Sequence, residues 1–269
     1  MHVTSLGFRT DLALLTAAGS LVEDRGTHLV IRSPENPSYF WGNFLLLAEP
    51  PVPGGEKEVV AAFHTEFPKA DHVSIGIDSE DLTDDARAAF EAAGMTVDLS
   101  TVLTTSRLTA PREVEAEVRP LVSDEDWEAR ARLSQQLYPQ TSEEAFMTFA
   151  RAKNAQEKKL VDAGRGQRFG AFVERALVST AGCFVTEAGV ARFQSVETHP
   201  DHRRRGLAGA VTHAAGQHAL DHLGVGTLVI VADTDGEAIG LYRSLGFTDS
   251  ERQLMMEQRS GEWAAMNES

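Results

Sequence analysis

The strand and helix patterns that follow one another between residues 115 and 260 most constrain what this chain can fold into. Residues Thr227–Ala232 (TLVIVA) form an uninterrupted apolar run, as expected for a strand that is covered on both faces. A helix pattern, Leu207–Leu223, precedes this run. A second, Glu237–Leu245, follows it and ends at Gly246, a residue suited to a helix C-terminus. This order predicts an α/β fold built around a mixed sheet.

The other elements of this part of the chain alternate in the same way. Short runs rich in β-branched and aromatic residues indicate strands, and Ala188-Gly189 indicates a turn between two of them. The expected strands are Gln167–Glu174, Ala176–Glu187, Val190–Thr198 and a last strand from Phe247, and the expected amphipathic helices are Trp127–Leu137 and Glu143–Asp162.

Residues 1–110 carry a fainter version of this order, which suggests an internal repeat. When the sequence is slid along itself by 152 positions, Phe90 falls on Tyr242 and Gly94 falls on Gly246. We therefore favour a duplicated fold, with an unrelated N-terminal domain as the alternative. The expected helices are Asp11–Ala18, Glu56–Phe67 and Asp84–Ala93, and the expected strands are Thr27–Arg32, Tyr39–Leu47, His72–Asp78 and Thr96–Thr104.

Pro111 marks the expected boundary between two domains. It lies between a strand that we expect to end at Leu108 and a strand that we expect to start at Val114. The sequence thus predicts an N-terminal domain at residues 1–111 and a second domain at residues 112–269. One continuous sheet through both halves is the alternative.

The charge balance excludes some classes of partner. The chain has 42% hydrophobic and 24% charged residues, as in a globular protein with a full core, and its formal net charge is −15. Nucleic acid is not an expected partner, because phosphate binding needs a basic surface. No signal peptide or membrane-spanning apolar run is visible, so we expect a cytoplasmic protein without a membrane partner. An acidic surface suits an amine substrate, although it also serves solubility.

Three adjacent arginines, Arg203, Arg204 and Arg205, stand out in this acidic chain. They lie between an expected strand end and an expected helix start. The unpaired N–H groups of a helix start attract anions, and the arginines add positive charge. Gly206 would let the backbone approach a diphosphate, and Ala208 would keep the next contact small. The loop therefore predicts a pyrophosphate site, and it matches neither the Walker nor the dinucleotide pattern.

Together with a second motif, this loop resembles the GNAT (Gcn5-related N-acetyltransferase) superfamily. The acyl-CoA loop of that family is Gln/Arg-x-x-Gly-x-Gly/Ala, which Arg203, Gly206 and Ala208 match. Its second signature is Asn-x-x-Ala-x-x-x-Tyr followed by Gly-Phe. Ala238, Tyr242, Gly246 and Phe247 match it, whereas Asp235 replaces the usual Asn. The resemblance covers roughly residues 115–260, and the whole chain resembles a tandem-GNAT protein with a degenerate first copy.

The resemblance implies roles for residues on both sides of a cleft. Backbone amides at Val196 and Thr198 would pair with the pantetheine arm, and the Val196 amide would polarise the thioester carbonyl. Tyr242 would protonate the departing CoA thiolate as general acid. The pyrophosphate would be held by Arg203, Arg204, Arg205, Gly206, Leu207 and Ala208, with Asp235 beside the cofactor.

The sequence does not identify the group that accepts the proton of the amine. Many family members carry Glu at the place of Gln194, and an amide cannot act as a base. Glu197 is a candidate, but strand alternation sends its side chain to the face opposite Gln194 unless the strand bulges there, as the strand of this family does. The sequence favours a salt-bridged or solvated Glu197 over Glu197 as the base. Positioning of an already neutral amine, with water taking the proton, is a further alternative.

No metal is expected. His218 and His222 are four residues apart on a helix, but no third ligand accompanies them. Cys183, the single cysteine, lies among apolar residues and reads as a buried hydrophobic side chain.

The sequence thus predicts transfer of an acetyl group from acetyl-CoA, as co-substrate, to a primary amine. The acceptor is a small-molecule or protein amine, and the chain is a monomer or homodimer. A non-enzymatic acyl-CoA-binding or regulatory module and an O-acyltransferase are the alternatives. The N-terminal copy has Pro50–Gly55 in place of the arginine loop and Phe90 in place of Tyr242, so we expect it not to bind CoA.

Overall fold

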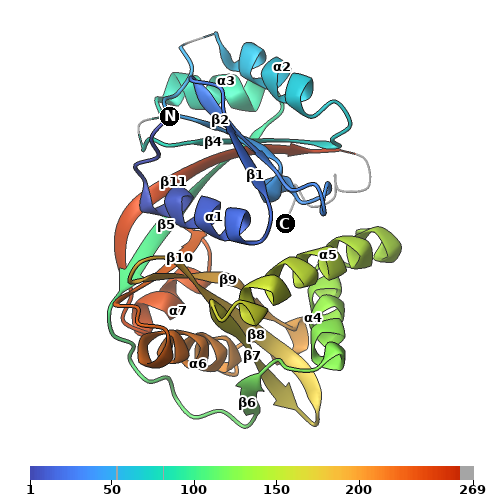
Figure 1. Cartoon of the computed structure of the whole chain (residues 1–269), viewed down its shortest axis with the longest axis vertical. Helices are drawn as coiled ribbons and strands as arrows, with labels where there is room; N and C mark the ends of the chain where they lie inside the picture. The colour runs from blue at the N-terminus through green and yellow to red at the C-terminus, as the bar shows by residue number, and fades with distance from the viewer. Residues whose placement is uncertain (53, 81, 261–269) are drawn as a thin grey trace. The chain divides into compact units, whose positions relative to one another are not determined.

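The computed structural model describes residues 1–52, 54–80 and 82–260 (Figure 1). The chain divides into two compact units. The first consists of Met1–Thr101 and the segment that begins at Glu251, and the second is Val102–Ser250. The strands β5 (Thr96–Thr105) and β11 (Thr248–Arg259) each begin in one unit and end in the other. The sequence-based division at residue 111 differs from this one, because the second half of the last strand, Leu254–Arg259, pairs with β4 of the first unit.

The second unit is a mixed sheet with helices on both faces. Its strands follow the order β5-β10-β9-β8-β7-β6, antiparallel from β6 to β9 and parallel between β9 and β10. Its elements are β6 (Glu117–Pro120), α4 (Asp124–Leu137), α5 (Glu143–Asp162), β7 (Gly166–Val173), β8 (Ala176–Glu187), β9 (Val190–Thr198), the 3-10 helix η2 (Pro200–His202), α6 (Leu207–His222), β10 (Thr227–Asp233) and α7 (Ala238–Ser244).

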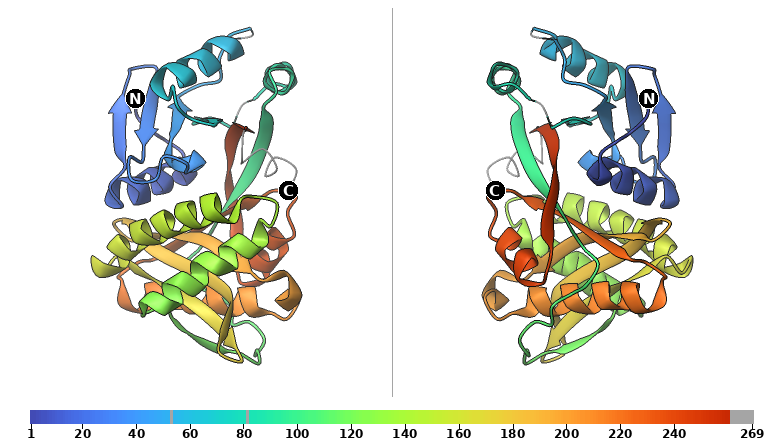
Figure 2. Two further views of the ribbon diagram at one scale, coloured as in Figure 1. Left: turned by 90° about the vertical axis from the view of Figure 1, so that its right-hand side faces the viewer. Right: turned by 90° about the vertical axis from the view of Figure 1, so that its left-hand side faces the viewer.

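Alternation along the strands separates the two helical layers. Phe172 and Leu177 pack with Trp127 of α4, whereas their neighbours Ala171 and Val178 pack with α6. Successive strand side chains point to opposite faces, so α4 and α6 cover opposite faces of the sheet. Figure 2 shows α4 and α5 together in front of the strands of this unit in its left view.

Helix starts are fixed by local hydrogen bonds. Ser123 and Asp126 form a capping box at the start of α4, and the Ser142 side chain caps α5. The capping box explains why α4 starts at Asp124, three residues before the predicted Trp127.

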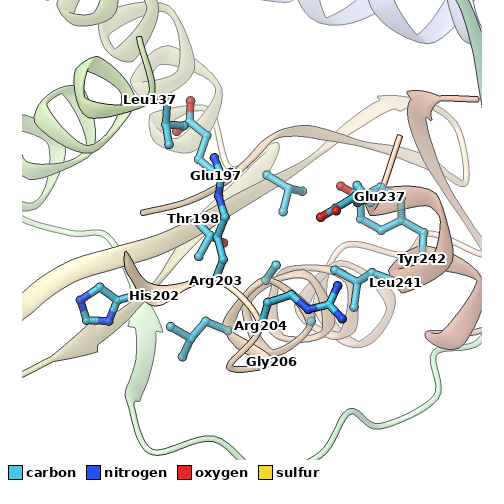
Figure 3. A pocket seen from close by; sticks show the side chains of 15 residues that line it. Leu137, Glu197, Thr198, His202, Arg203, Arg204, Gly206, Glu237, Leu241 and Tyr242 are labelled. Carbon is cyan, nitrogen blue, oxygen red and sulfur yellow. The ribbon is translucent and has the colours of Figure 1, made fainter. Parts of the chain in front are cut away.

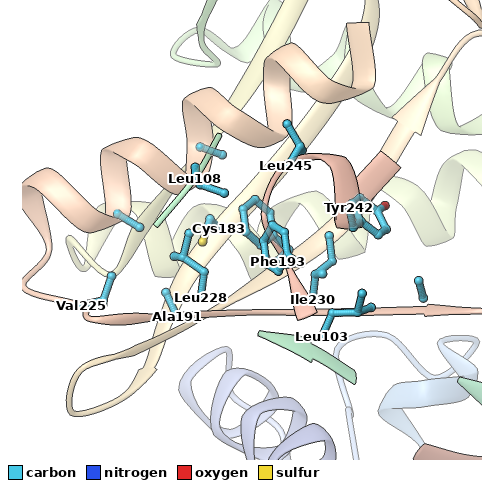
Figure 4. Packing of buried hydrophobic residues seen from close by; sticks show 14 of the residues in the cluster. Leu103, Leu108, Cys183, Ala191, Phe193, Val225, Leu228, Ile230, Tyr242 and Leu245 are labelled. Atoms are coloured by element: carbon cyan, nitrogen blue, oxygen red, sulfur yellow. The ribbon is translucent and has the colours of Figure 1, made fainter. Parts of the chain in front are cut away.

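One hydrophobic cluster joins α6, α7 and the centre of the sheet. Figure 4 shows Cys183, Phe193, Leu228 and Tyr242 in this cluster. Cys183 is 1% exposed, and burial raises the pKa of its thiol, as expected for a side chain that serves packing.

The first unit follows the order β1-β2-β3-β4-β11-β5, with β3 and β4 parallel. Its own core contains Phe63, Ile75, Phe90 and Met256. The elements are α1 (Leu6–Ala17), β1 (Leu21–Asp24), β2 (His28–Arg32), the 3-10 helix η1 (Phe40–Gly42), β3 (Phe44–Leu47), α2 (Glu56–Glu66), β4 (His72–Ile77) and α3 (Asp84–Ala92).

The duplicated order predicted from the sequence is present in the two units. Along each half of the chain, three successive antiparallel strands lead to a helix, a parallel strand, a second helix and a last strand, which is β5 after the first half and β11 after the second. Gly94 and Gly246, which the shifted sequences superimpose, both have left-handed φ angles, of 83° and 97°. Phe90 occupies in α3 the place that Tyr242 occupies in α7.

Several sequence-based boundaries were wrong. Residues Tyr39–Leu47 are not one strand, because the Asn43 side chain donates to the carbonyls of Asn36 and Tyr39 and so stabilises a turn before β3. Helix α1 starts five residues earlier than predicted, where Ser5 caps it. The strand expected from Val114 starts at Glu117, and β1 was not predicted.

Candidate functional site

A cavity of about 360 Å³ lies in the second unit, where two parallel strands part. The pairing of β9 with β10 ends at Arg192 and Val229, although β9 continues to Thr198 and β10 to Asp233. The edge of β9 beyond Arg192 is therefore not covered by β10. The cavity is lined by Leu137, Val196, Glu197, Thr198, His202, Arg203, Arg204, Gly206, Leu207, Ala208, Gly209, Glu237, Ala238, Leu241 and Tyr242.

A β-bulge in β9 shapes one wall of this cavity. Ser195 has a φ of 46°, in the left-handed region, and the register with β8 shifts there. Gln194 lies opposite Gly182 and Glu197 lies opposite Thr180. Because Gly182 and Thr180 are two residues apart, the extra residue of the bulge brings Gln194 and Glu197 to the same face. The bulge that the sequence left as a condition for Glu197 to reach the cavity is present.

The arginine loop forms the opposite end of the cavity. The turn η2 leads into Arg203, Arg204 has a φ of 62°, and Gly206 has a φ of 83° immediately before α6. No side chain caps the first turn of α6. The N–H groups and the dipole of this helix start are thus directed at the loop, together with the charges of Arg203 and Arg204.

Gly206 is needed for a reason that the sequence did not show. A Cβ at this position would lie 2.8 Å from Nε of Arg112 and 3.3 Å from Cγ1 of Val114. The side chain of Arg112 therefore fills the space that the glycine leaves, and its Nη2 donates to the carbonyl of Arg204 at 2.9 Å. The glycine admits a neighbouring arginine and the left-handed backbone.

Tyr242 lies across the cavity from Glu197 and Thr198, as Figure 3 shows. The tyrosine is 5% exposed, and burial raises the pKa of its hydroxyl to about 12. The phenol therefore keeps its proton at neutral pH and can donate it.

Glu197 is held by helix α4. The hydroxyl of Ser134 lies 2.9 Å from each carboxylate oxygen, and Nε of Arg130 lies 3.7 Å from Oε2. Its side chain is 15% exposed, so it remains open to the cavity.

Two of the residues singled out in the sequence do not line the cavity. Arg205 donates to Nδ1 of His202 at 2.9 Å, and the backbone N–H of Asp235 donates to the Asp233 side chain. Sequence reasoning missed Glu237, which lines the cavity beside Ala238. Its place inside the second motif was the available signal, since Ala238 and Tyr242 were already assigned to the site.

The histidine pair is a stacked contact on α6. The rings of His218 and His222 lie 4.9 Å apart, and Nδ1 of His222 lies 3.2 Å from the carbonyl of His218. Among the residues that the structure describes, no three His, Cys, Asp or Glu side chains gather in a way that could hold a metal ion.

The comparisons with known proteins concern the family and the fold. Residues 169–256 match the family model described as FR47-like protein, and this range covers β8–β10, α6, α7 and most of β7 and β11. No curated protein is similar enough in sequence to count as a match.

Solved structures share the fold over most of the chain. A conserved protein of unknown function from Staphylococcus epidermidis is 11% identical with a TM-score of 0.70, covering 90% of this chain and 94% of its own. A GCN5-related N-acetyltransferase from Kribbella flavida is 19% identical with a TM-score of 0.60, covering 97% and 99%. A tandem GNAT protein from the clavulanic acid biosynthesis pathway is 16% identical with a TM-score of 0.52, covering 93% and 88%.

These similarities confirm the fold that the resemblance implied. The chain has the fold of the GNAT superfamily, and its arrangement is similar to that of a tandem GNAT protein. None of the described helices combines the length and the apolar character needed to cross a membrane.

Proposed function

We propose that this protein is an acyltransferase that moves an acetyl group from acetyl-CoA to a primary amine by direct attack. One observation carries the proposal. A single cavity connects the arginine loop at the start of α6 to Glu197 and Tyr242, along the stretch of β9 that β10 leaves uncovered. This arrangement supports a proposed anion site at the arginine loop, an open strand edge at β9 and a proton donor at Tyr242 within one cavity.

The loop would hold the cofactor pyrophosphate. The backbone of Arg204–Ala208 at the start of α6 would supply N–H groups, and the side chains of Arg203 and Arg204 would supply charge. From there the pantetheine arm would lie along Val196–Thr198 like an added strand, because β10 does not pair with this stretch of β9.

The chemistry would use groups at the other end of the cavity. The amine nitrogen attacks the thioester carbonyl carbon, and the Val196 N–H stabilises the negative charge that develops on the oxygen. The C–S bond then breaks, the amide product forms and the thiolate takes a proton from Tyr242. The proton lost by the amine passes to Glu197, directly or through water. Glu197 is the base we favour, because the bulge turns it into the cavity.

The acceptor is a small-molecule or protein amine, and a positively charged one suits the cavity end lined by Glu197 and Glu237. Nucleic acid, membrane and metal have no place in this proposal, and we expect a cytoplasmic monomer or homodimer.

The test is release of free thiol from acetyl-CoA in the presence of a panel of amines, with products identified by mass spectrometry. An acetamide product supports the proposal. An ester product that hydroxylamine cleaves would indicate an O-acyltransferase, and binding of acetyl-CoA without thiol release would indicate a non-enzymatic module.

A further inference from the structure

A fully buried arginine contacts the backbone of the bulge that shapes one wall of the cavity. Arg168, on β7, has no solvent exposure. Its Nη2 donates to the carbonyl of Gln194 at 2.9 Å, and its Nη1 donates to the carbonyl of Ser195 at 3.1 Å. One guanidinium thus binds two consecutive carbonyl groups of β9.

A regular strand could not offer these two groups together. Successive carbonyls of a strand point in opposite directions, towards its two neighbours. Two successive carbonyls that share one side chain therefore belong to the bulge itself, where Ser195 takes its left-handed φ of 46°. The charged hydrogen bonds of Arg168 offset the cost of this backbone conformation.

The charge of Arg168 is balanced inside the protein. Glu157 of α5 accepts from Nε at 2.7 Å and from Nη2 at 3.1 Å. Arg130 of α4 also donates to Glu157, at 3.2 Å. Burial alone would raise the pKa of Glu157, but the two guanidinium groups outweigh burial and lower it to about 2.

The same chain of contacts ends in the cavity. Arg130 lies between Glu157 and Glu197, at 3.7 Å from the latter, and Asn154 fixes Arg130 by a further hydrogen bond. The residues Arg168, Glu157 and Arg130 therefore connect the bulge backbone to the carboxylate of Glu197. We call these three residues the buried charge network.

We propose that Arg168 is a positioning residue, which holds the β9 bulge and so keeps the edge of β9 open for an acyl-CoA ligand. Its consequence for the ligand rests on the function proposed above. The alternative is that Arg168 only adds stability, like any buried ion pair.

The positioning role and the purely stabilising role predict effects of Arg168→Lys in different parts of the protein. Lysine keeps the positive charge but cannot bind both carbonyls in the fork geometry of arginine. We expect hydrogen exchange in the ligand-free protein to accelerate at least about tenfold in peptides covering residues 192–199. This factor corresponds to the loss of one charged hydrogen bond. The affinity for CoA, measured by calorimetry well below the unfolding temperature, should fall by a similar factor.

Arg119→Lys is the matched control. Arg119 also forms a two-pronged ion pair, with Asp126 at 2.8 Å for both contacts, but it touches neither β9 nor the cavity. This variant should lose stability and leave exchange in β9 and CoA affinity unchanged. If Arg168→Lys fails to fold, Glu157→Gln replaces it, because the amide holds the guanidinium less firmly and should accelerate β9 exchange in the same peptides.

The outcomes separate the two proposals. Exchange in β9 that is no faster in the Arg168 or Glu157 variant than in Arg119→Lys overturns the positioning role. If wild-type protein does not bind CoA while the β9 exchange responds as expected, the proposed function fails and the role of Arg168 in holding the bulge stands.

Discussion

Arg112 and Arg204 are joined by a hydrogen bond of 2.9 Å from the Arg112 guanidinium to the Arg204 carbonyl, although they are far apart in the sequence. The same guanidinium lies against Gly206. The segment that precedes β6 therefore supports the arginine loop from behind and helps to set the left-handed backbone at Arg204.

We predict that Arg112→Ala weakens CoA binding by about tenfold, since it removes one charged hydrogen bond from the loop. Calorimetric titration with CoA checks this. Arg132→Ala, at an exposed arginine of α4 outside the cavity lining, serves as the control and should bind as wild type. Equal CoA affinity of the two variants would show that Arg112 does not support the loop.

Gly206→Ala should reduce CoA affinity more than its cost in stability explains. The new Cβ meets Arg112 at 2.8 Å and also strains the left-handed backbone, by about 1–2 kcal/mol. Gly224→Ala is a matched control, because Gly224 has a φ of 66° but open space around it. Both variants should lower the free energy of unfolding, and only Gly206→Ala should lower CoA affinity. A parallel loss of affinity in Gly224→Ala contradicts the account.

Glu157→Gln should make stability less sensitive to acid. The pKa of Glu157 is lowered from 4.5 to about 2 in the folded protein, so its contribution is present above about pH 4.5 and is lost as the pH falls towards 2. At pH 7 the variant should be less stable by roughly 3–5 kcal/mol, because Arg130 and Arg168 lose their shared carboxylate.

Urea unfolding at pH 7 and pH 3 measures the free energy of unfolding of both proteins. The difference between the wild type and Glu157→Gln should be smaller at pH 3 than at pH 7. Glu128→Gln, which breaks an exposed ion pair with Arg151, should cost less than about 1 kcal/mol at pH 7. A Glu157→Gln deficit that does not change with pH would show that the carboxylate charge is not what matters.

Tyr242→Phe should lower turnover by about 100-fold or more, the usual contribution of a positioned acid, while CoA binds nearly as before. Because burial raises the pKa of Tyr242 to about 12, the wild-type phenol should stay protonated up to about pH 10, with no loss of turnover from its ionisation below that pH. Steady-state kinetics with the best amine of the panel tests both statements. Unchanged turnover in the variant would end the assignment of Tyr242 as the acid.

Most of the second unit could be predicted from the sequence, because its signals are local. Helix α5 was predicted with its observed ends, and β8 and β9 likewise, since apolar periodicity and the Ala188-Gly189 turn fix them. The two motifs also brought most of the cavity lining together, since a motif places residues on either side of a loop or along one helix face.

Contacts between residues far apart in the chain could not be predicted from the sequence. Glu157 and Arg168 look like ordinary solvated charges on an amphipathic helix and a strand, and only the fold shows that both are buried against each other. Gly206 contacts Arg112, and hydrophobic periodicity does not predict this contact. The pairing of β11 with β4 depends likewise on tertiary structure, so the last strand was assigned to the second domain.

Calorimetric titration of CoA tests most directly whether the arginine loop is the acyl-CoA site. It is carried out with the wild-type protein and with the double variant Arg203→Ala, Gly206→Glu. The variant removes one loop charge and places a carboxylate in the cavity lining where we propose the anion site. We predict saturable binding of one CoA per wild-type chain and no detectable binding to a folded double variant. Equal affinity of the two proteins for CoA would contradict the assignment of the arginine loop as the acyl-CoA site.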